Sequence, residues 1–289
     1  MAGDKYPDET NRRRFVKGVV GGAALSGVGA GTAAAINSAT NRSGRGGGVT
    51  QFFGIENTDG PAPRGMPQIV VDVDEEGFVK GRFPAITEIT RAGQSVTVAQ
   101  EDIGDITYSN RWFQFCGVQT MPGVRVDTVD RFDEYFRYAP QEQLPSGLAW
   151  QQEAEDVSPG ERVHVDHFQD YEGWGNEVGS SGIGKPAKVT WRSEGLKPEE
   201  SMIVELIRST RVEELSAESD WLAESTGQGF LAYLDKCTHF CCVPSFKGYP
   251  GSSKFGAEDK VYCPCHQSVY DPYSIVRKTF TALPRPEEA

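Results

Sequence analysis

The chain has 289 residues, with 41 Asp or Glu against 29 Lys or Arg and a formal net charge of −12. Such an acidic balance argues against nucleic-acid binding, which needs a basic face, and it is typical of proteins kept soluble in high salt, so we expect a halophilic source. A hydrophobic fraction of 38% and 33 glycines favour a β-rich body with many turns over a helical bundle.

The N-terminus combines a basic run with an apolar one. Arg12-Arg13-Arg14-Phe15-Val16-Lys17 precedes a Gly/Ala-rich stretch that ends near Ile36, and the pattern resembles a twin-arginine export signal. We expect residues 1–14 to be a cytoplasmic tail. Residues 15–36 would measure about 33 Å as a helix, enough to cross a bilayer, so we expect a transmembrane anchor there. Cleavage near Ala33-Ala34-Ala35 is the alternative.

The next segment lacks any apolar period. Residues 37–60 begin with a Gly/Ser/Arg-rich run and are expected to form a flexible linker. Weak alternation over Gln68–Val73 and clear alternation over Ser95–Val98 then predict strands.

Residues 100–182 are irregular and rich in aromatic side chains. We interpret this stretch as an insertion, called the inserted segment below, with a short helix near Val129–Tyr138. Its aromatic residues are expected to fill a core: Trp112, Phe113, Phe115, Phe132, Tyr135, Phe136 and Tyr138.

Two features of the inserted segment carry chemical side chains. Val163-His164-Val165-Asp166-His167, with Asp170, offers imidazoles and carboxylates, but on a strand the two histidines would point to opposite faces. We therefore expect surface histidines. Cys116 is expected to be a small buried hydrophobic residue, with pairing to Cys241 as the alternative.

Strand patterns resume after the inserted segment. They cover Ala187–Arg192, Ser201–Arg208, Phe230–Leu234 and Ile275–Phe280. Thr210-Arg211-Val212-Glu213 has the form of a capping box and predicts a helix from Thr210 to about Ala223.

Most of the soft metal ligands lie in two short boxes. Cys237-Thr238-His239-Phe240-Cys241-Cys242 and Cys263-Pro264-Cys265-His266-Gln267-Ser268 contain five of the six cysteines and two of the four histidines. One Cys and one His from each box would supply a Rieske-type [2Fe–2S] centre, in which Cys holds one iron and His the other. A tetrahedral Cys2His2 zinc site is the alternative. It would leave Cys242 and Cys265 without a role, and it would not explain the hydroxyl side chains of Ser268 and Tyr270 at the end of the second box and just after it.

The boxes resemble the C-T-H-x-G-C and C-P-C-H-G-S signatures of the Rieske iron–sulfur proteins of cytochrome bc-type complexes. The resemblance implies that Cys237 and Cys263 bind the inner iron, and that His239 and His266 bind the outer one. It further implies the remaining roles: a disulfide between Cys242 and Cys265, hydrogen bonds from Ser268 to a bridging sulfide and from Tyr270 to a cysteine ligand, and shielding by Phe240.

The same resemblance implies a fold and a function. The fold would be mainly β, a Rieske-type antiparallel β-sandwich over residues 61–289 with a cluster-binding subdomain at about 236–275, preceded by the transmembrane helix. The chain would be the electron-transfer subunit of a quinol:electron-acceptor oxidoreductase. His266, with His239 beside it, would contact quinol and accept its proton. Leu283–Pro286 resembles the proline loop that covers the cluster.

Location and partners follow from that function. The globular domain would lie outside the cytoplasm, tethered to the cell membrane beside a cytochrome b-type subunit, with a cytochrome c or a copper protein as the next electron carrier in a respiratory chain. The linker would let the domain swing between these partners.

Two positions depart from the family pattern, and two other functions remain open. Cys241 and Gln267 stand where the family has Gly, so a positive φ there would strain them, and Cys241 is a rival partner for Cys265. The chain could instead be the small Rieske subunit of an exported molybdenum oxidoreductase, such as arsenite oxidase. A Rieske oxygenase would need a further 2-His-1-carboxylate iron site, for which only His164 and His167 remain.

Overall fold

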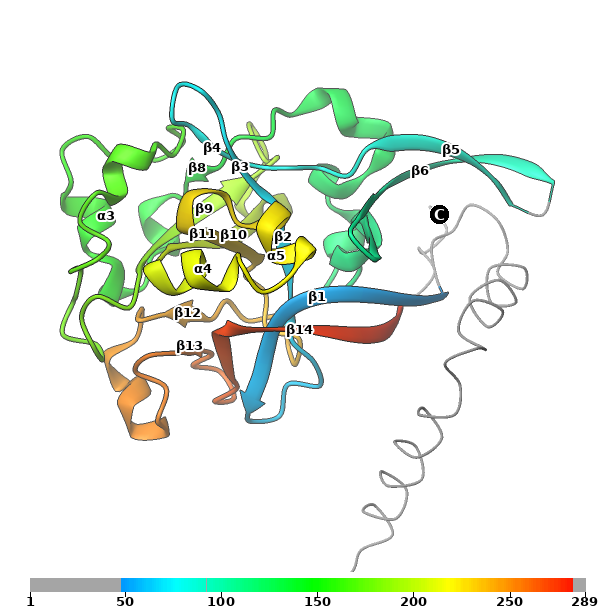
Figure 1. Cartoon of the computed structure of the whole chain (residues 1–289). Coiled ribbons are helices and arrows are strands. Elements are labelled where there is room, and N and C mark those ends of the chain that lie inside the picture. Colours follow the sequence, from blue (N-terminus) through cyan, green and yellow to red (C-terminus); the bar gives the residue numbers. More distant parts are fainter. Residues whose placement is uncertain (1–47, 92, 283–289) are drawn as a thin grey trace, which may run out of the picture.

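Antiparallel strands are the main regular elements of the computed structural model, which describes residues 48–91 and 93–282 (Figure 1). The strands are β1 (Gly48–Asp59), β2 (Met66–Ile69), β3 (Val71–Val73), β4 (Val79–Gly81), β5 (Ile86–Arg91), β6 (Gln94–Ile103), β7 (Ile106–Ser109), β8 (Arg137–Tyr138), β9 (Lys185–Trp191), β10 (Met202–Arg208), β11 (Phe230–Leu234), β12 (Ser245–Phe246), β13 (Val261–Tyr262) and β14 (Val269–Ala282).

Helices in this part of the chain are short. The α-helices are α3 (Trp150–Glu153), α4 (Thr210–Leu215) and α5 (Asp220–Ser225). The 3-10 helices are Asn110–Phe113, Val118–Thr120, Pro122–Val124, Val126–Arg131, Gln141–Gln143, Ser146–Leu148, Val165–Phe168, Pro198–Glu200, Gly227–Gly229 and Pro250–Phe255. The prediction of a mainly β, antiparallel fold is therefore confirmed.

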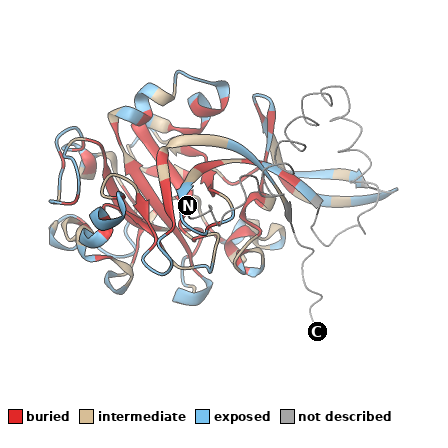
Figure 2. Cartoon of the chain, turned by 90° about the horizontal axis from the view of Figure 1, so that it is seen from below, coloured by how far each residue is buried: buried red, intermediate tan, exposed pale blue. Residues whose placement is uncertain are grey.

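One large sheet dominates the topology. Its order is β12-β13-β14-β1-β2-β11-β10-β9-β8, and neighbouring strands pair antiparallel. β1 and β14 run side by side along almost their whole length (Figure 1). A second sheet, β5-β6-β7, includes the β5–β6 hairpin, which extends away from the body and is largely exposed (Figure 2).

The strands β9 to β11 separate two hydrophobic cores. Along β11, Phe230, Ala232 and Leu234 face the larger core, whereas Leu231 and Tyr233 face the smaller one, as the period of two in a strand requires. All five residues are buried, which explains why this strand reads as a continuous apolar run.

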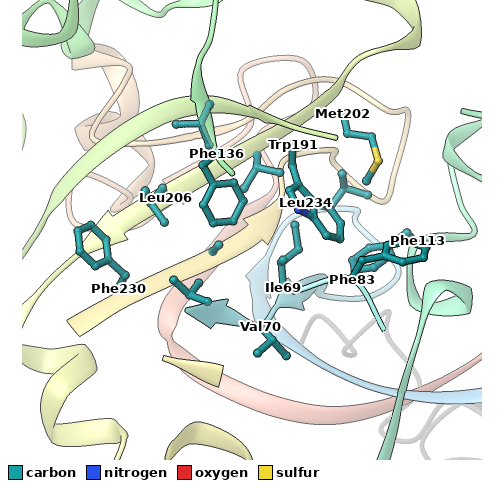
Figure 3. Packing of buried hydrophobic residues seen from close by; sticks show 14 of the residues in the cluster. Ile69, Val70, Phe83, Phe113, Phe136, Trp191, Met202, Leu206, Phe230 and Leu234 are labelled. Carbon is teal, nitrogen blue, oxygen red and sulfur yellow. The ribbon is translucent and has the colours of Figure 1, made fainter. Parts of the chain in front are cut away.

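The larger core contains the aromatic residues of the inserted segment. Trp112, Phe113, Phe136 and Tyr138 are buried in it, and Figure 3 shows Phe113 and Phe136 packed around Trp191 of β9. The expectation of a core is confirmed for these four rings, and Phe115 packs against them, whereas Tyr135 is only half-buried and belongs to no core in the described part of the chain. The inserted segment therefore shares the core of the main sheet.

The smaller core holds the residues of the two boxes that lie deepest. Cys237, Cys263 and Tyr270 pack there with Tyr233 of β11 and Phe246 of β12. The two cores thus place the buried rings of the inserted segment and the deepest residues of the cysteine boxes on opposite faces of β9 to β11.

Most predicted strands are present. Phe230–Leu234 matches β11 at both ends, and the runs at 187–192 and 201–208 correspond to β9 and β10. Ser95–Val98 belongs to the longer β6, and the run at 275–280 to the longer β14. The run at 68–73 divides at Val70 into the end of β2 and all of β3.

The linker expected over residues 37–60 is wrong for the part that the structure describes. Gly48–Asp59 is strand β1, in which Thr50, Phe52 and Ile55 are buried and the backbone pairs with β14. Residues 37–47 lie outside the described part of the chain, as do the expected anchor at 15–36 and the proline loop at 283–286. Within the described part, no helix is long and apolar enough to cross a membrane.

Two helix predictions need correction. The helix expected near Val129–Tyr138 is wrong, because the chain forms a 3-10 helix that ends at Arg131 and then strand β8. The helix expected from Thr210 to Ala223 is two helices, α4 and α5. The first is capped by the Ser209 side chain, which accepts a hydrogen bond from the Arg211 amide.

Candidate metal centre

The first cysteine box forms a tight loop between β11 and β12. The Cys237 amide donates to the Cys242 carbonyl (2.7 Å), and the Cys241 amide donates back to the Cys237 carbonyl (3.0 Å). Cys241 adopts a φ of 63° to close this turn, a conformation that glycine tolerates without steric cost. The positive φ that would strain a non-glycine residue at this position is therefore present, and Cys241 adopts it.

The second box repeats this shape between β13 and β14. The Cys263 amide donates to the Ser268 carbonyl (2.9 Å), the Gln267 amide donates to the Cys263 carbonyl (3.0 Å), and Gln267 has a φ of 62°. Gly60 packs against this loop, since a Cβ on it would come within 2.6 Å of the Gln267 carbonyl oxygen. The two boxes are thus two copies of one backbone turn.

The six cysteines divide into two disulfides and two free thiols. Cys242 pairs with Cys265 across the loops, with a Cα–Cα distance of 6.5 Å, as the resemblance implied. Cys116 pairs with Cys241, so the alternative for these two residues is correct and the expectation of an unpaired Cys116 is wrong. Cys237 and Cys263 are free and buried.

The free thiols are neighbours. The pKa of Cys237 is lowered to about 5, chiefly because the Cys263 thiol donates a hydrogen bond to its thiolate, with further help from the Tyr270 hydroxyl. The same contact raises the pKa of Cys263, and burial adds to the rise. The Sγ atoms of Cys242, Cys263 and Cys265 also lie within 4.8 Å of one another. Two of these three form a disulfide, so Cys263 is the one with a thiol to offer a metal.

The two histidines of the boxes contact each other. The ring centroids of His239 and His266 are 4.8 Å apart, and the Phe240 ring lies 4.3 Å from His239 and 5.1 Å from His266. His266 is exposed, whereas His239 is half-buried. The Nδ1 atom of His239 is buried and has no hydrogen-bond partner among the described residues. The loops therefore bring the two imidazoles into contact, and the same two loops carry the two neighbouring free thiols.

Two hydroxyl groups lie beside this set. The Tyr270 hydroxyl is 3.2 Å from the Cys237 Sγ and accepts a hydrogen bond from the Thr238 amide at the same distance. Ser268 is fully buried, and its Oγ has no hydrogen-bond partner among the described residues. Within the described part of the chain, no hydrogen bond of good geometry satisfies this hydroxyl, but it lies close enough to Cys237 to help lower the pKa of that thiol, after the larger effects of Cys263 and Tyr270.

The other pair of histidines does not form a comparable site. His164 and His167 lie on a 3-10 turn instead of the expected strand, because the His164 side chain caps it by accepting from the Asp166 amide. His164 Nε2 is 2.7 Å from the Glu76 carbonyl, and His167 Nδ1 is 2.8 Å from the Tyr138 hydroxyl. Both are partly buried, so they are structural residues and not the surface histidines that we expected.

A buried ion network beneath the first loop was not foreseen. The Lys188 ammonium on β9 contacts the Asp235 carboxylate, lies 3.4 Å from Glu205 Oε1 and donates to the Pro244 carbonyl (2.6 Å). Glu205 in turn accepts from the Phe246 amide. All three charged side chains have no exposed surface. One ammonium therefore joins the two ends of the first loop.

Arg64 is a second unforeseen contact of the first loop. Its carbonyl accepts from the Thr238 hydroxyl (2.6 Å), and its guanidinium lies over the rings of Phe52, Phe115 and Phe280. Burial lowers the pKa of Arg64 to about 10.

Comparison with known protein families, characterised proteins and solved structures finds no match to this chain.

Proposed function

We propose that this chain is the Rieske-type iron–sulfur subunit of a membrane quinol oxidoreductase of the cytochrome bc type. One observation carries the proposal: disulfides occupy four of the six cysteines, and the remaining two are buried neighbours in the two loops whose histidines contact each other. Two thiolates and two imidazoles, one of each per loop, are the ligand set of a Rieske-type [2Fe–2S] centre.

The polar atoms around the thiols fit that group. The unpartnered Nδ1 of His239 is suited to bind iron, and the unpartnered Oγ of Ser268 is suited to donate to a sulfide. A zinc ion bound to the same four side chains would have no sulfide, so Ser268 could donate only to the Cys237 thiolate. An iron–sulfur centre would give this buried hydroxyl a sulfide as a further acceptor, and we favour it over zinc for that reason.

The bound centre would supply one-electron transfer, and the side chains around it would handle the proton. His266 is exposed, so the ring nitrogen that is not bound to iron can accept a hydrogen bond from a quinol hydroxyl and hold its proton. Phe240 is 65% exposed beside it and offers an apolar surface against which a quinol ring can pack. His239 lies deeper and would act mainly as a ligand.

The remaining parts of the proposal concern location and partners. The twin-arginine pattern and the apolar run at residues 15–36 support export followed by retention in the cell membrane. There the subunit would work with a cytochrome b-type protein and pass electrons to a cytochrome c or a copper protein. The small Rieske subunit of an exported molybdenum oxidoreductase is the competing assignment, because it needs the same centre but no permanent anchor.

The test is to purify the full chain from membranes and measure iron, acid-labile sulfide and the electron paramagnetic resonance spectrum after reduction. We expect about two irons per chain and the signal of a His-ligated [2Fe–2S] centre. Cys237→Ser should abolish the signal, whereas the control His164→Gln should retain it. Zinc in place of iron would overturn the proposal. A soluble product lacking the apolar run, copurified with a molybdenum subunit, would favour the competing assignment.

A further inference from the structure

The first loop lacks the support that closes the second. The second loop joins two strands that pair directly with each other, with Val261 opposite Tyr270 and Tyr262 opposite Val269. The first loop joins β11, which pairs with β10 and β2, to β12, which pairs with β13. No ladder links its ends, so another part of the chain must hold it in place.

The inserted segment supplies a covalent link to this loop. Cys116 and Cys241 form a disulfide across 125 residues of sequence, with a Cα–Cα distance of 5.3 Å. The link is made at the left-handed residue of the turn, where Cys241 has a φ of 63°. Gln267 occupies the same place in the second loop, is exposed, and has no such link.

Two further contacts bring the inserted segment to the same loop. The Cys116 Sγ lies 3.5 Å from the Cys237 carbonyl oxygen. The Phe115 ring lies 4.6 Å from the Arg64 guanidinium, and the Arg64 carbonyl holds the Thr238 hydroxyl. These contacts reach the loop at Cys237 and Thr238, before His239, and the disulfide reaches it at Cys241, after His239.

We propose that Cys116 and Cys241 are positioning residues, whose disulfide fixes the first loop and thereby the orientation of His239 in the metal centre. The disulfide does for the first loop what the β13–β14 ladder does for the second. The role assigned to His239 rests on the proposed function, whereas the clamping of the loop does not depend on bound iron.

The first measurement needs no variant. Iron-free, non-reduced wild-type protein is alkylated after denaturation and examined by mass spectrometry. We expect label on Cys237 and Cys263 and none on Cys116 or Cys241. Label on Cys116 and Cys241 would show that the clamp is absent and would overturn the proposal, whatever metal the protein binds.

The second measurement compares Cys116→Ser/Cys241→Ser with wild-type holoprotein. We expect iron release to a chelator to be about tenfold faster, because a link that closes a long loop restricts the open state strongly. Of the two histidine nitrogen hyperfine couplings in the reduced protein, one should change and the other should stay. Cys116→Ala/Cys241→Gly restores an unstrained turn without the link, so it should show the same altered coupling. Gln267→Gly, the matched control in the second loop, should leave the wild-type couplings.

The outcomes separate positioning from simple stabilisation. A lower melting temperature with both couplings unchanged would mean that the disulfide only stabilises the fold, and the proposal would be overturned. If the wild-type protein holds no iron, the proposed function fails, and tryptic cleavage after Lys236 in the iron-free proteins decides whether the loop is clamped. Faster cleavage in the serine variant, with cleavage after Lys260 unchanged, would support the clamp. Equal rates would overturn it.

Discussion

The two loops of the candidate centre share a backbone shape but are held in place by different interactions. Each closes with the same pair of amide-to-carbonyl hydrogen bonds and the same left-handed residue. The second loop extends from a β-ladder, whereas the first is held by the Lys188 network, the link to Cys116 and the contact with Arg64.

This difference shows that a loop whose flanking strands do not pair with each other can be fixed by side chains from distant segments. The ladder of the second loop uses backbone N–H and C=O groups, which must form hydrogen bonds whenever they are buried. The first loop instead buries an ammonium and two carboxylates, and buried charges are stable only while all of them remain partnered. The first loop should therefore be much more sensitive to substitution at its base.

The largest expected effect comes from removing the charge below the first loop. Lys188→Met leaves Glu205 and Asp235 buried without their cation, and breaking a buried pair in this way costs about 3–5 kcal/mol of the free energy of unfolding. Burial already raises the pKa of Asp235 to about 8 in the intact network. Denaturant unfolding of the iron-free protein measures the loss.

The same strand provides the control for Lys188→Met. Lys185 on β9 pairs with Asp170, whose side chain is 61% exposed, so Lys185→Met should cost no more than about 1 kcal/mol. Equal losses in the two variants would contradict the view that the first loop depends on a buried ion network.

A smaller effect concerns the hydroxyl groups that the two loops offer to the centre. Ser268 ends the second loop, and Tyr270 reaches across to the cysteine of the first. If the proposed centre is bound, both hydroxyls favour its reduced, more negative state. Ser268→Ala and Tyr270→Phe should each lower the reduction potential by up to about 100 mV, since a hydrogen bond to a charged group contributes about 1.5–3 kcal/mol.

Protein-film voltammetry of the purified holoprotein measures these potentials. Tyr273→Phe is a suitable control, because Tyr273 lies on the same strand but its hydroxyl donates to the Ile183 carbonyl, away from the sulfur atoms. A potential that changes equally in all three variants would contradict a specific role for Ser268 and Tyr270.

The sequence revealed the features whose signals are local and missed those that depend on distant contacts. The strand at Phe230–Leu234 is a short apolar run, and the candidate ligands of each box lie within a few residues of one another, so both could be identified from the sequence. By contrast, Lys188 and Asp235 are far apart in the chain and reveal nothing individually. A lysine in a strand is ordinarily exposed, and only the fold shows that this one is buried between carboxylates.

The errors have the same physical origin. Val163 and Val165 indicate a strand, but the His164 side chain caps a turn there. The glycines before Val49 suggested a linker, yet strand β1 begins at Gly48 because β14 pairs with it from the other end of the chain. Cys116 resembled an isolated buried thiol, because nothing near it in the sequence identifies Cys241 as its partner.

The smallest expected effect tests the left-handed residue of the second loop alone. An L-residue in this conformation lowers the free energy of unfolding by about 1–2 kcal/mol relative to glycine. Glycine has an opposing effect of about 0.4–1 kcal/mol, because it gives the unfolded chain more conformational freedom. Gln267 is exposed, and its side chain forms no hydrogen bond among the described residues. Gln267→Gly should therefore raise the free energy of unfolding of the iron-free protein by about 0.5–1 kcal/mol. Urea unfolding measures the change, and a loss of stability would mean that Gln267 makes a contact that offsets its backbone strain.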